Sequence, residues 1–248
     1  MAGKVGTRNH VHMEKTAAHM PGDLNRLRRE TDMLAATVDS LRDDEMAAPS
    51  LAEGWTRSHI VAHLAGNARA ITRLAEWAVS GEEQSMYPSR ESRDAEIEEL
   101  AALPPAELKR VFHDANAALD AALQKMQNGT VAATALHGPP GEFSAYQVPT
   151  LRMSEVLIHH LDLDTAWGLD EADMDALEDT LEMVMGRITG REDWPGLTIE
   201  TDEGEQYVLG DGTTHVTGGR DAILGWITRG ITTGVRCDAE LPGLPAYA

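Results

Sequence analysis

A carboxylate and two imidazoles stand close together in the segment Ser154–Asp164, which reads SEVLIHHLDLD. Glu155 and His159 are four residues apart, so on a helix their side chains would lie on the same face. Arg152 and Asp162 extend that face in the two directions. Burying polar groups in an otherwise apolar helix is costly unless they are paired. The segment therefore predicts a partner for these groups.

A second pair of histidines, His59 and His63, also has four-residue spacing, and His63 borders an apolar stripe next to Leu64. Helical bundles commonly build metal sites from inward-facing residues on different helices. Two histidines and one glutamate are the ligand set of a catalytic zinc ion that keeps an open position for water or substrate. The spacing thus supports the hypothesis of a three-ligand zinc site.

Other interpretations of these residues stay open on spacing alone. In a chain with ten histidines, one Glu-x-x-x-His pair is expected roughly once by chance, and it could form only a surface hydrogen bond. His59 and His160 are expected to be structural or solvated rather than ligands. Asp162 and Asp164 could be ordinary exposed acids.

Composition limits the class of protein. The 248 residues are 42% hydrophobic, which suffices for one large domain or two smaller ones. The single cysteine, Cys237, allows no intrachain disulfide and suits a reducing compartment. No apolar run approaches a membrane span and the N-terminus lacks a signal-like apolar region, so we expect a cytoplasmic protein.

The formal charge of −20, from 41 acids against 21 bases, disfavours binding to nucleic acid or to anionic lipid. We infer no protein partner either. An anionic substrate would need local positive charge, supplied by a metal ion or by arginines.

Apolar spacing predicts a mainly helical N-terminal region. Helices are expected from Pro21 to about Leu41, from Thr56 to Gly81, from Asp94, from Pro104–Pro105, from Thr150 to Trp167 with a Gly168 cap, and from Asp173 to Ile188. Residues 128–149 predict a long loop or a loose hairpin.

After Gly190 the sequence alternates apolar and polar residues, which predicts two or three short antiparallel strands before a last helix in RDAILGWITRGI. The predicted organisation is a flexible leader at residues 1–20, with Met13 an alternative start, a helical metal-binding domain at 21–190, and a small α+β domain at 191–248.

Three segments, EGWTRSHIVAHLAGNARAI, GEEQSMYPSRESRDAEI and SEVLIHHLDL, resemble in order and spacing the mycothiol-dependent maleylpyruvate isomerases. These belong to the zinc-binding, DinB-like family of mycothiol-dependent enzymes. The resemblance runs from about Leu51 to Gly168 and resumes around GWITRG. The first and third segments are shared across the wider family, whereas the middle one favours the isomerases. The fold implied is a DinB-like four-helix bundle followed by a small α+β domain.

The resemblance also implies roles for individual residues. The family's zinc ligands correspond to His63, Glu155 and His159, which leaves out His59 and His160. A catalytic arginine corresponds to Arg229 in ITRGITTG.

Three further residues are weaker candidates. Arg152 and Arg57 could bind substrate, although surface salt bridges are the alternative for both. Asp162 could accept the second ring N–H of His159, a usual outer partner of a metal ligand.

The activity implied by the resemblance is the cis–trans isomerisation of 3-maleylpyruvate to 3-fumarylpyruvate in gentisate breakdown. Zinc would favour the thiolate of mycothiol, and reversible addition of that thiolate to the double bond would allow rotation. Cys237 then need not be a nucleophile. The expected partners are a small diacid substrate and mycothiol. The alternatives are a mycothiol S-transferase acting on other electrophiles, or a non-catalytic zinc-binding DinB-like regulatory module.

Overall fold

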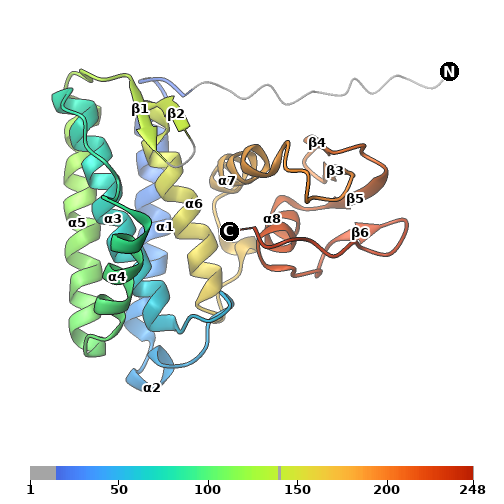
Figure 1. Ribbon diagram of the computed structural model, residues 1–248, viewed down its shortest axis with the longest axis horizontal. Coiled ribbons are helices and arrows are strands. Elements are labelled where there is room, and N and C mark those ends of the chain that lie inside the picture. Colours follow the sequence, from blue (N-terminus) through green and yellow to red (C-terminus); the bar gives the residue numbers. More distant parts are fainter. Residues whose placement is uncertain (1–14, 139–140, 248) are drawn as a thin grey trace. The chain divides into compact units, whose positions relative to one another are not determined.

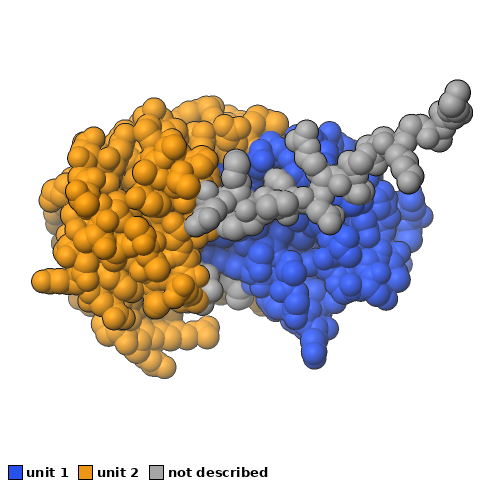
Figure 2. All heavy atoms as spheres, turned by 90° about the horizontal axis from the view of Figure 1, so that it is seen from above, with its two compact units in different colours: residues 1–13, 177–248 blue, residues 14–176 orange. Residues whose placement is uncertain are grey.

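The computed structural model describes residues 15–138 and 141–247. The chain divides into two compact units, one covering residues 14–176 and the other containing residues 177–248 (Figure 2). The division falls near the start of α7 (Met174–Ile188), whereas the sequence predicts it near Gly190, just after this helix. Most of the predicted leader, residues 1–14, lies outside the described residues.

Four long helices form the first unit (Figure 1). They are α1 (Met20–Ser40), α3 (Arg57–Ser80), α5 (Pro105–Asn128) and α6 (Val148–Asp162). Both α1 and α3 pack against α5 and against α6, which closes a four-helix bundle. The short helices α2 (Asp43–Met46) and α4 (Arg90–Ala101) pack against α3. The predicted helical bundle is confirmed, although α4 begins at Arg90, before the predicted Asp94.

Local sequence explains where α3 and α5 begin and end. Thr56 caps α3, because its hydroxyl accepts a hydrogen bond from the His59 N–H. Gly81 ends the helix in the left-handed conformation, with φ of 77°. Pro105 begins α5, where its missing N–H costs nothing. The apolar stripe of α3 that the sequence predicts is buried: Ile60, Leu64, Ala68, Ile71 and Leu74.

The predicted end of α6 at Trp167 is wrong. The helix ends at Asp162, because Asp164 adopts a left-handed conformation with φ of 49° that cannot continue a right-handed helix. Gly168 consequently does not cap α6 and instead precedes the short 3-10 helix η2 (Leu169–Glu171).

Between α5 and α6 the chain forms a hairpin, which was one of the two structures predicted for residues 128–149. Strands β1 (Ala135–Gly138) and β2 (Gly141–Ser144) pair antiparallel, and the 3-10 turn η1 (Ala145–Gln147) leads into α6.

The second unit contains a sheet of four strands in the order β4-β3-β5-β6. The strands are β3 (Leu197–Thr201), β4 (Gln206–Leu209), β5 (Thr214–Gly218) and β6 (Arg236–Cys237), and α8 (Arg220–Arg229) connects the last two. The expectation of antiparallel pairing holds for β3 with β4 but is wrong for β3 with β5, which run parallel. Alternation identifies the two faces of a strand and carries no information on its direction. None of the described helices is both long and apolar enough to span a membrane.

Candidate metal centre

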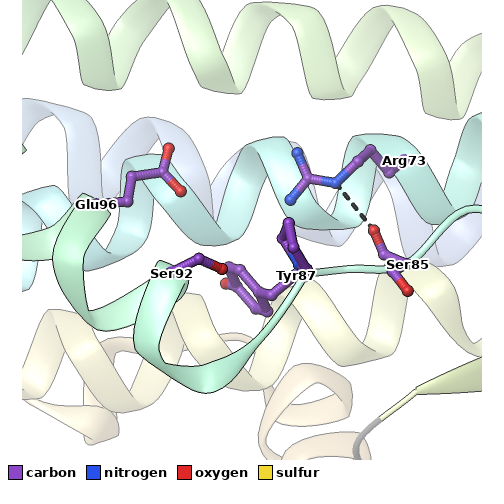
Figure 3. Close-up of a pocket in the computed structure, with 6 residues that line it drawn as sticks. Arg73, Ser85, Tyr87, Ser92 and Glu96 are labelled. Atoms are coloured by element: carbon purple, nitrogen blue, oxygen red, sulfur yellow. Dashed lines mark hydrogen bonds between the residues drawn. The ribbon is translucent and has the colours of Figure 1, made fainter.

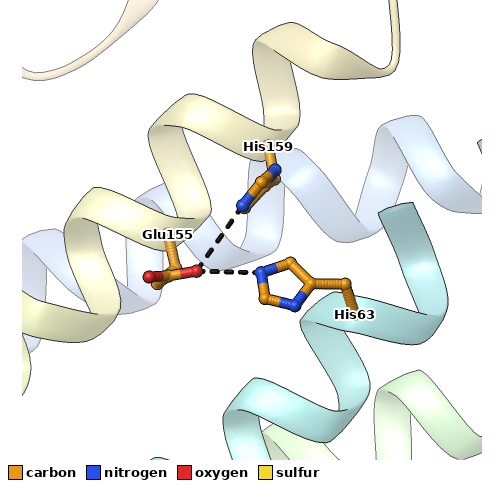
Figure 4. Close-up of side chains that lie close together, drawn as sticks. All are labelled: His63, Glu155 and His159. Atoms are coloured by element: carbon orange, nitrogen blue, oxygen red, sulfur yellow. Dashed lines mark hydrogen bonds and ion pairs between the residues drawn. The ribbon is translucent and has the colours of Figure 1, made fainter. Parts of the chain in front are cut away.

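Three side chains from two helices meet inside the bundle (Figure 4). His63 comes from α3, and Glu155 and His159 come from α6. One potential ligand atom of each lies within 4.8 Å of the others. Oε2 of Glu155 is 2.9 Å from Nε2 of His63 and 3.5 Å from Nε2 of His159. Among the described residues, no other such group of three histidine, cysteine or carboxylate side chains is found.

Arg57 ties together the two helices that carry these residues. It is the first residue of α3, and its guanidinium donates to the backbone carbonyls that follow α6: 2.5 Å to Leu163 and 2.7 Å to Asp164. Carbonyls at a helix C-terminus lack partners within the helix, so a cation is favourable there. Arg57 is thus engaged with backbone, and its suggested contact with substrate stays a prediction.

Asp162 holds the second ring nitrogen of His159. Its Oδ2 lies 2.7 Å from Nδ1 of His159, and the residue is fully buried. The alternative of an exposed acid is therefore wrong for Asp162. An acceptor at Nδ1 directs the proton there and leaves Nε2, the atom that faces Glu155, free to act as a ligand.

Burial and hydrogen bonding shift the pKa values of all three side chains. Burial opposes ionisation of Glu155, but hydrogen bonds from His159 and His63 hold its pKa well below the usual range. Burial, reinforced by repulsion from His159, lowers the pKa of His63 to about 4. Burial also acts against the charged form of His159, yet the hydrogen bonds to Asp162 and Glu155 prevail and raise its pKa.

Arg152 lies one turn before Glu155 on α6 and is fully buried. Its two terminal nitrogens donate to the side-chain amide oxygens of Asn67, at 2.6 Å, and Asn116, at 2.9 Å. Burial lowers the pKa of Arg152 to about 10, while Glu155 acts in the opposite direction. Complete burial excludes the surface salt bridge considered for this residue.

The remaining histidines of the two motifs lie outside the cluster. The ring of His59 contacts the hydroxyl of Thr56 at 2.7 Å, at the start of α3. His160 is buried, contacts the hydroxyl of Thr37 at 2.7 Å and stacks on Trp167 with ring centroids 3.7 Å apart.

Arg93 is a neighbour of the cluster that the spacing did not reveal. It lies on α4, in the segment SRESRD, and its Nη2 is 3.4 Å from Nδ1 of His63. Its other terminal nitrogen donates to Asp94 at 2.8 Å. The contact between α3 and α4 places it there, and helical periodicity within one segment cannot indicate which helix packs against it.

Arg229, the arginine implied by the resemblance, is the last residue of α8 in the second unit. It is half-buried, and Nη1 donates to the carbonyl of Thr228 at 2.6 Å. Its catalytic role stays a prediction.

The donor set suits a metal ion. Two imidazoles and one carboxylate converge from two helices that are fixed to one another, and the second nitrogen of His159 already has its acceptor. This matches the donor set of a three-ligand metal site.

Comparison with known proteins agrees with this geometry. Residues 27–164 match the family described as the mycothiol maleylpyruvate isomerase N-terminal domain. Two crystal structures of a mycothiol-dependent maleylpyruvate isomerase, one of them the H52A mutant, are similar to the chain with a TM-score of 0.81. Sequence identity to them is 27% for the mutant and 28% for the other, and each alignment covers 92% of this chain and 96% of that one.

Two curated relatives are uncharacterized proteins, MT0041 and Rv0036c, from Mycobacterium tuberculosis strains CDC 1551 / Oshkosh and ATCC 25618 / H37Rv. Each is 35% identical over 147 residues, which is 58% of this chain and 55% of the relative. The match thus spans about half the length of these relatives.

Proposed function

Because the chain belongs to the mycothiol maleylpyruvate isomerase N-terminal domain family, we propose that it is a metal- and mycothiol-dependent cis–trans isomerase acting on 3-maleylpyruvate. The observation that carries the proposal is the convergence of His63, Glu155 and His159 on one place. The likeness to the solved isomerases over both units supports it further.

We propose zinc as the ion, held by these three side chains. When bound, the ion would favour the thiolate form of mycothiol, whose reversible addition lowers the bond order of the cis double bond and permits rotation.

The chain's own residues contribute orientation and charge. Asp162 fixes the ring of His159 and keeps Nε2 turned toward the site. Arg93 places a cation beside His63, where it can attract a carboxylate of the substrate or the negative charge that develops on its carbonyl oxygen. Its only salt bridge within the described residues is to Asp94, which is 53% exposed, so little is lost when Arg93 turns toward an anion.

The decisive experiment assays the purified protein with 3-maleylpyruvate, with and without mycothiol, before and after removal of metal by a chelator. We expect formation of 3-fumarylpyruvate that needs both the thiol and the ion. Absence of isomerisation together with conjugation of mycothiol to other electrophiles would identify the S-transferase alternative. Absence of thiol binding by the metal-loaded protein would favour a non-catalytic module.

Arg229 is proposed as a catalytic cation that stabilises the developing oxyanion. Arg229→Ala should retain the metal and lower kcat by about 100-fold, the usual cost of removing one such donor. Steady-state kinetics and metal analysis on the same sample check this, with Arg187→Ala as a control. Unchanged turnover would show that Arg229 has no catalytic part.

A further inference from the structure

A cavity of about 340 Å³ lies on the helical unit, between α3 and the segment that leads into α4 (Figure 3). Its lining residues are Arg73, Ser85, Tyr87, Pro88, Ser92 and Glu96. All of them except Pro88 carry a polar side chain. Such a lining offers hydrogen-bonding groups beside apolar surface, which suits a ligand that carries both hydroxyl and C–H groups.

Arg73 holds one wall of the cavity in place. Its Nε donates to the backbone carbonyls of Ser85 and Met86, each at 3.1 Å, and Nη2 also donates to Met86. The guanidinium thereby fixes the chain that carries Tyr87, whose ring lies 6.0 Å from it. The wall is therefore set by contacts within the chain and does not depend on a ligand.

Tyr87 and Glu96 each have an oxygen atom that can hydrogen-bond a ligand. No hydrogen bond engages the hydroxyl of Tyr87 in the part of the chain that the structure describes. Burial, aided by the charge of Glu155, raises the pKa of Tyr87 to about 12, so the phenol is a proton donor at neutral pH. Glu96 binds Arg69 through Oε1, at 2.8 Å, and its Oε2 is left to accept from a hydroxyl group.

Two lining residues of the cavity, Glu96 and Ser92, lie toward the candidate metal centre. A Cβ added to Gly66, three residues after His63, would lie 3.5 Å from Oε2 of Glu96. Glu96 therefore packs over α3 about one turn beyond the ligand. On the other side, Ser92 of the lining is followed directly by Arg93, which reaches His63. From His63 to Arg73 the helix rises roughly 15 Å, a span that an extended ligand of two or three linked groups can cover.

We propose that this cavity binds the polyhydroxylated sugar and inositol part of the thiol cofactor, with the thiol arm directed along α3 toward His63. The proposal rests on the mycothiol dependence proposed above. Tyr87 donates to a ring hydroxyl, Glu96 accepts from one, and the faces of Tyr87 and Pro88 contact ring C–H groups. Recognition of the sugar part is thus separate from the chemistry of the sulfur.

The test uses the glucosaminyl-inositol fragment of mycothiol, which lacks the thiol arm, and calorimetric titration of the full chain. The fragment should bind the unmodified protein. Tyr87→Phe and Glu96→Gln should each weaken its binding about threefold to tenfold, the cost of one hydrogen bond. Glu99→Gln, the same change at an exposed position of the same helix, should leave the affinity unchanged. Circular dichroism and metal analysis verify that every variant is folded and retains the ion.

Two results would overturn the subsite. One is that the fragment does not bind the unmodified protein. The other is that Tyr87→Phe and Glu96→Gln bind the fragment as tightly as the control Glu99→Gln. Because the fragment has no sulfur, its binding is measured independently of isomerisation. Fragment binding without isomerase activity would refute the proposed function and leave the subsite standing. Isomerase activity with unaltered fragment affinity in both cavity variants would refute the subsite alone.

Discussion

Two clusters of buried charge, one in each unit, are built from similar residue types but balance their charges differently. In the second unit Arg220 contacts both Glu205 and Glu178, and the hydroxyl of Thr201 donates to Glu205. In the helical unit Glu155 faces two imidazoles, and within the described residues no lysine or arginine forms a salt bridge with it. The first cluster supplies its own cation, whereas the second presents converging donors to a cation from outside.

This difference separates a cluster that holds a fold from one that can do chemistry. A carboxylate whose partner is a guanidinium has its lone pairs occupied, and breaking the pair leaves a buried charge alone. A carboxylate between two imidazoles keeps ligand atoms that can turn to a metal ion. Substitutions in the two clusters should therefore change different properties of the protein.

The largest effect is expected for His63→Ala. It removes the one proposed ligand that comes from α3. Metal affinity and isomerase activity should each fall by more than about 100-fold, because even the loss of a residue that only hydrogen-bonds a ligand can cost up to that much. The unfolding temperature of the metal-free protein should change little, because α3 keeps its apolar stripe. Metal analysis, activity assays and thermal unfolding check the three expectations, with His59→Ala as the control that retains the ion. Full activity in a metal-free variant would contradict the division drawn above.

Arg220→Met should have the opposite result. It leaves Glu205 buried without its cation, so the free energy of unfolding should fall by about 3 kcal/mol. Metal binding by the folded protein should be unchanged. Denaturant titration and metal analysis measure the two effects. Arg236→Met, which breaks an exposed pair with Asp202, serves as the control and should cost less than about 1 kcal/mol. Loss of metal in Arg220→Met would show that the two clusters are coupled.

Asp162→Asn tests a residue that shares features of both clusters. Asp162 is buried like a structural residue, but it contacts a proposed metal ligand. Metal affinity should drop by about 10- to 100-fold, because the amide no longer supplies a charged acceptor to Nδ1 of His159. Competition with a chromophoric chelator measures this. Asp164→Asn, at an exposed neighbouring position, is the control. An affinity equal to that of the unmodified protein would assign Asp162 to the fold alone.

The smallest effect is expected for Glu30, a buried carboxylate with neither a strong cation nor a ligand role. Oε1 accepts the N–H of Asp173 at 3.0 Å, and burial raises the pKa of this carboxyl. A carboxyl whose pKa is higher when folded than unfolded supports the fold at low pH and loses this contribution as pH rises through the folded-state pKa.

Glu30→Gln should therefore raise the unfolding temperature by about 1–3 °C at pH 7 and should lose this advantage below the pKa of the unfolded state, about pH 4. Thermal unfolding at both pH values checks the sign. If Glu30→Gln stabilises the protein equally at low pH, the effect comes from hydrogen bonding and not from removal of the buried negative charge.

The sequence predicts the three candidate metal-binding residues, which the structure brings together, better than their surroundings. Glu155 and His159 lie four apart on one helix, and such local spacing survives folding unchanged. Their link to His63 depends on α3 and α6 packing together, which a resemblance can supply but periodicity cannot. The same limit explains why the sequence does not predict Arg93 and Asn116, since each lies on a helix other than the two that carry the candidate metal-binding residues.

In the fold, the helical bundle and the strands after Gly190 follow from hydrophobic periodicity. The parallel pairing of β3 with β5 does not, because alternation carries no direction. The early end of α6 depends on the left-handed conformation of Asp164, which aspartate tolerates but does not require. Such features are decided by tertiary contacts rather than by local sequence.

The contact of Arg57 with the end of α6 has a consequence for how this protein can diverge. Its acceptors are main-chain carbonyls, which every amino acid provides, so these two hydrogen bonds do not themselves require particular side chains at 163 and 164. Besides the packing of α3 against α6, one side chain at the start of α3 thus helps to fix the spacing of the two helices that carry the candidate metal-binding residues. This contact can therefore persist when the side chains at its acceptor positions change.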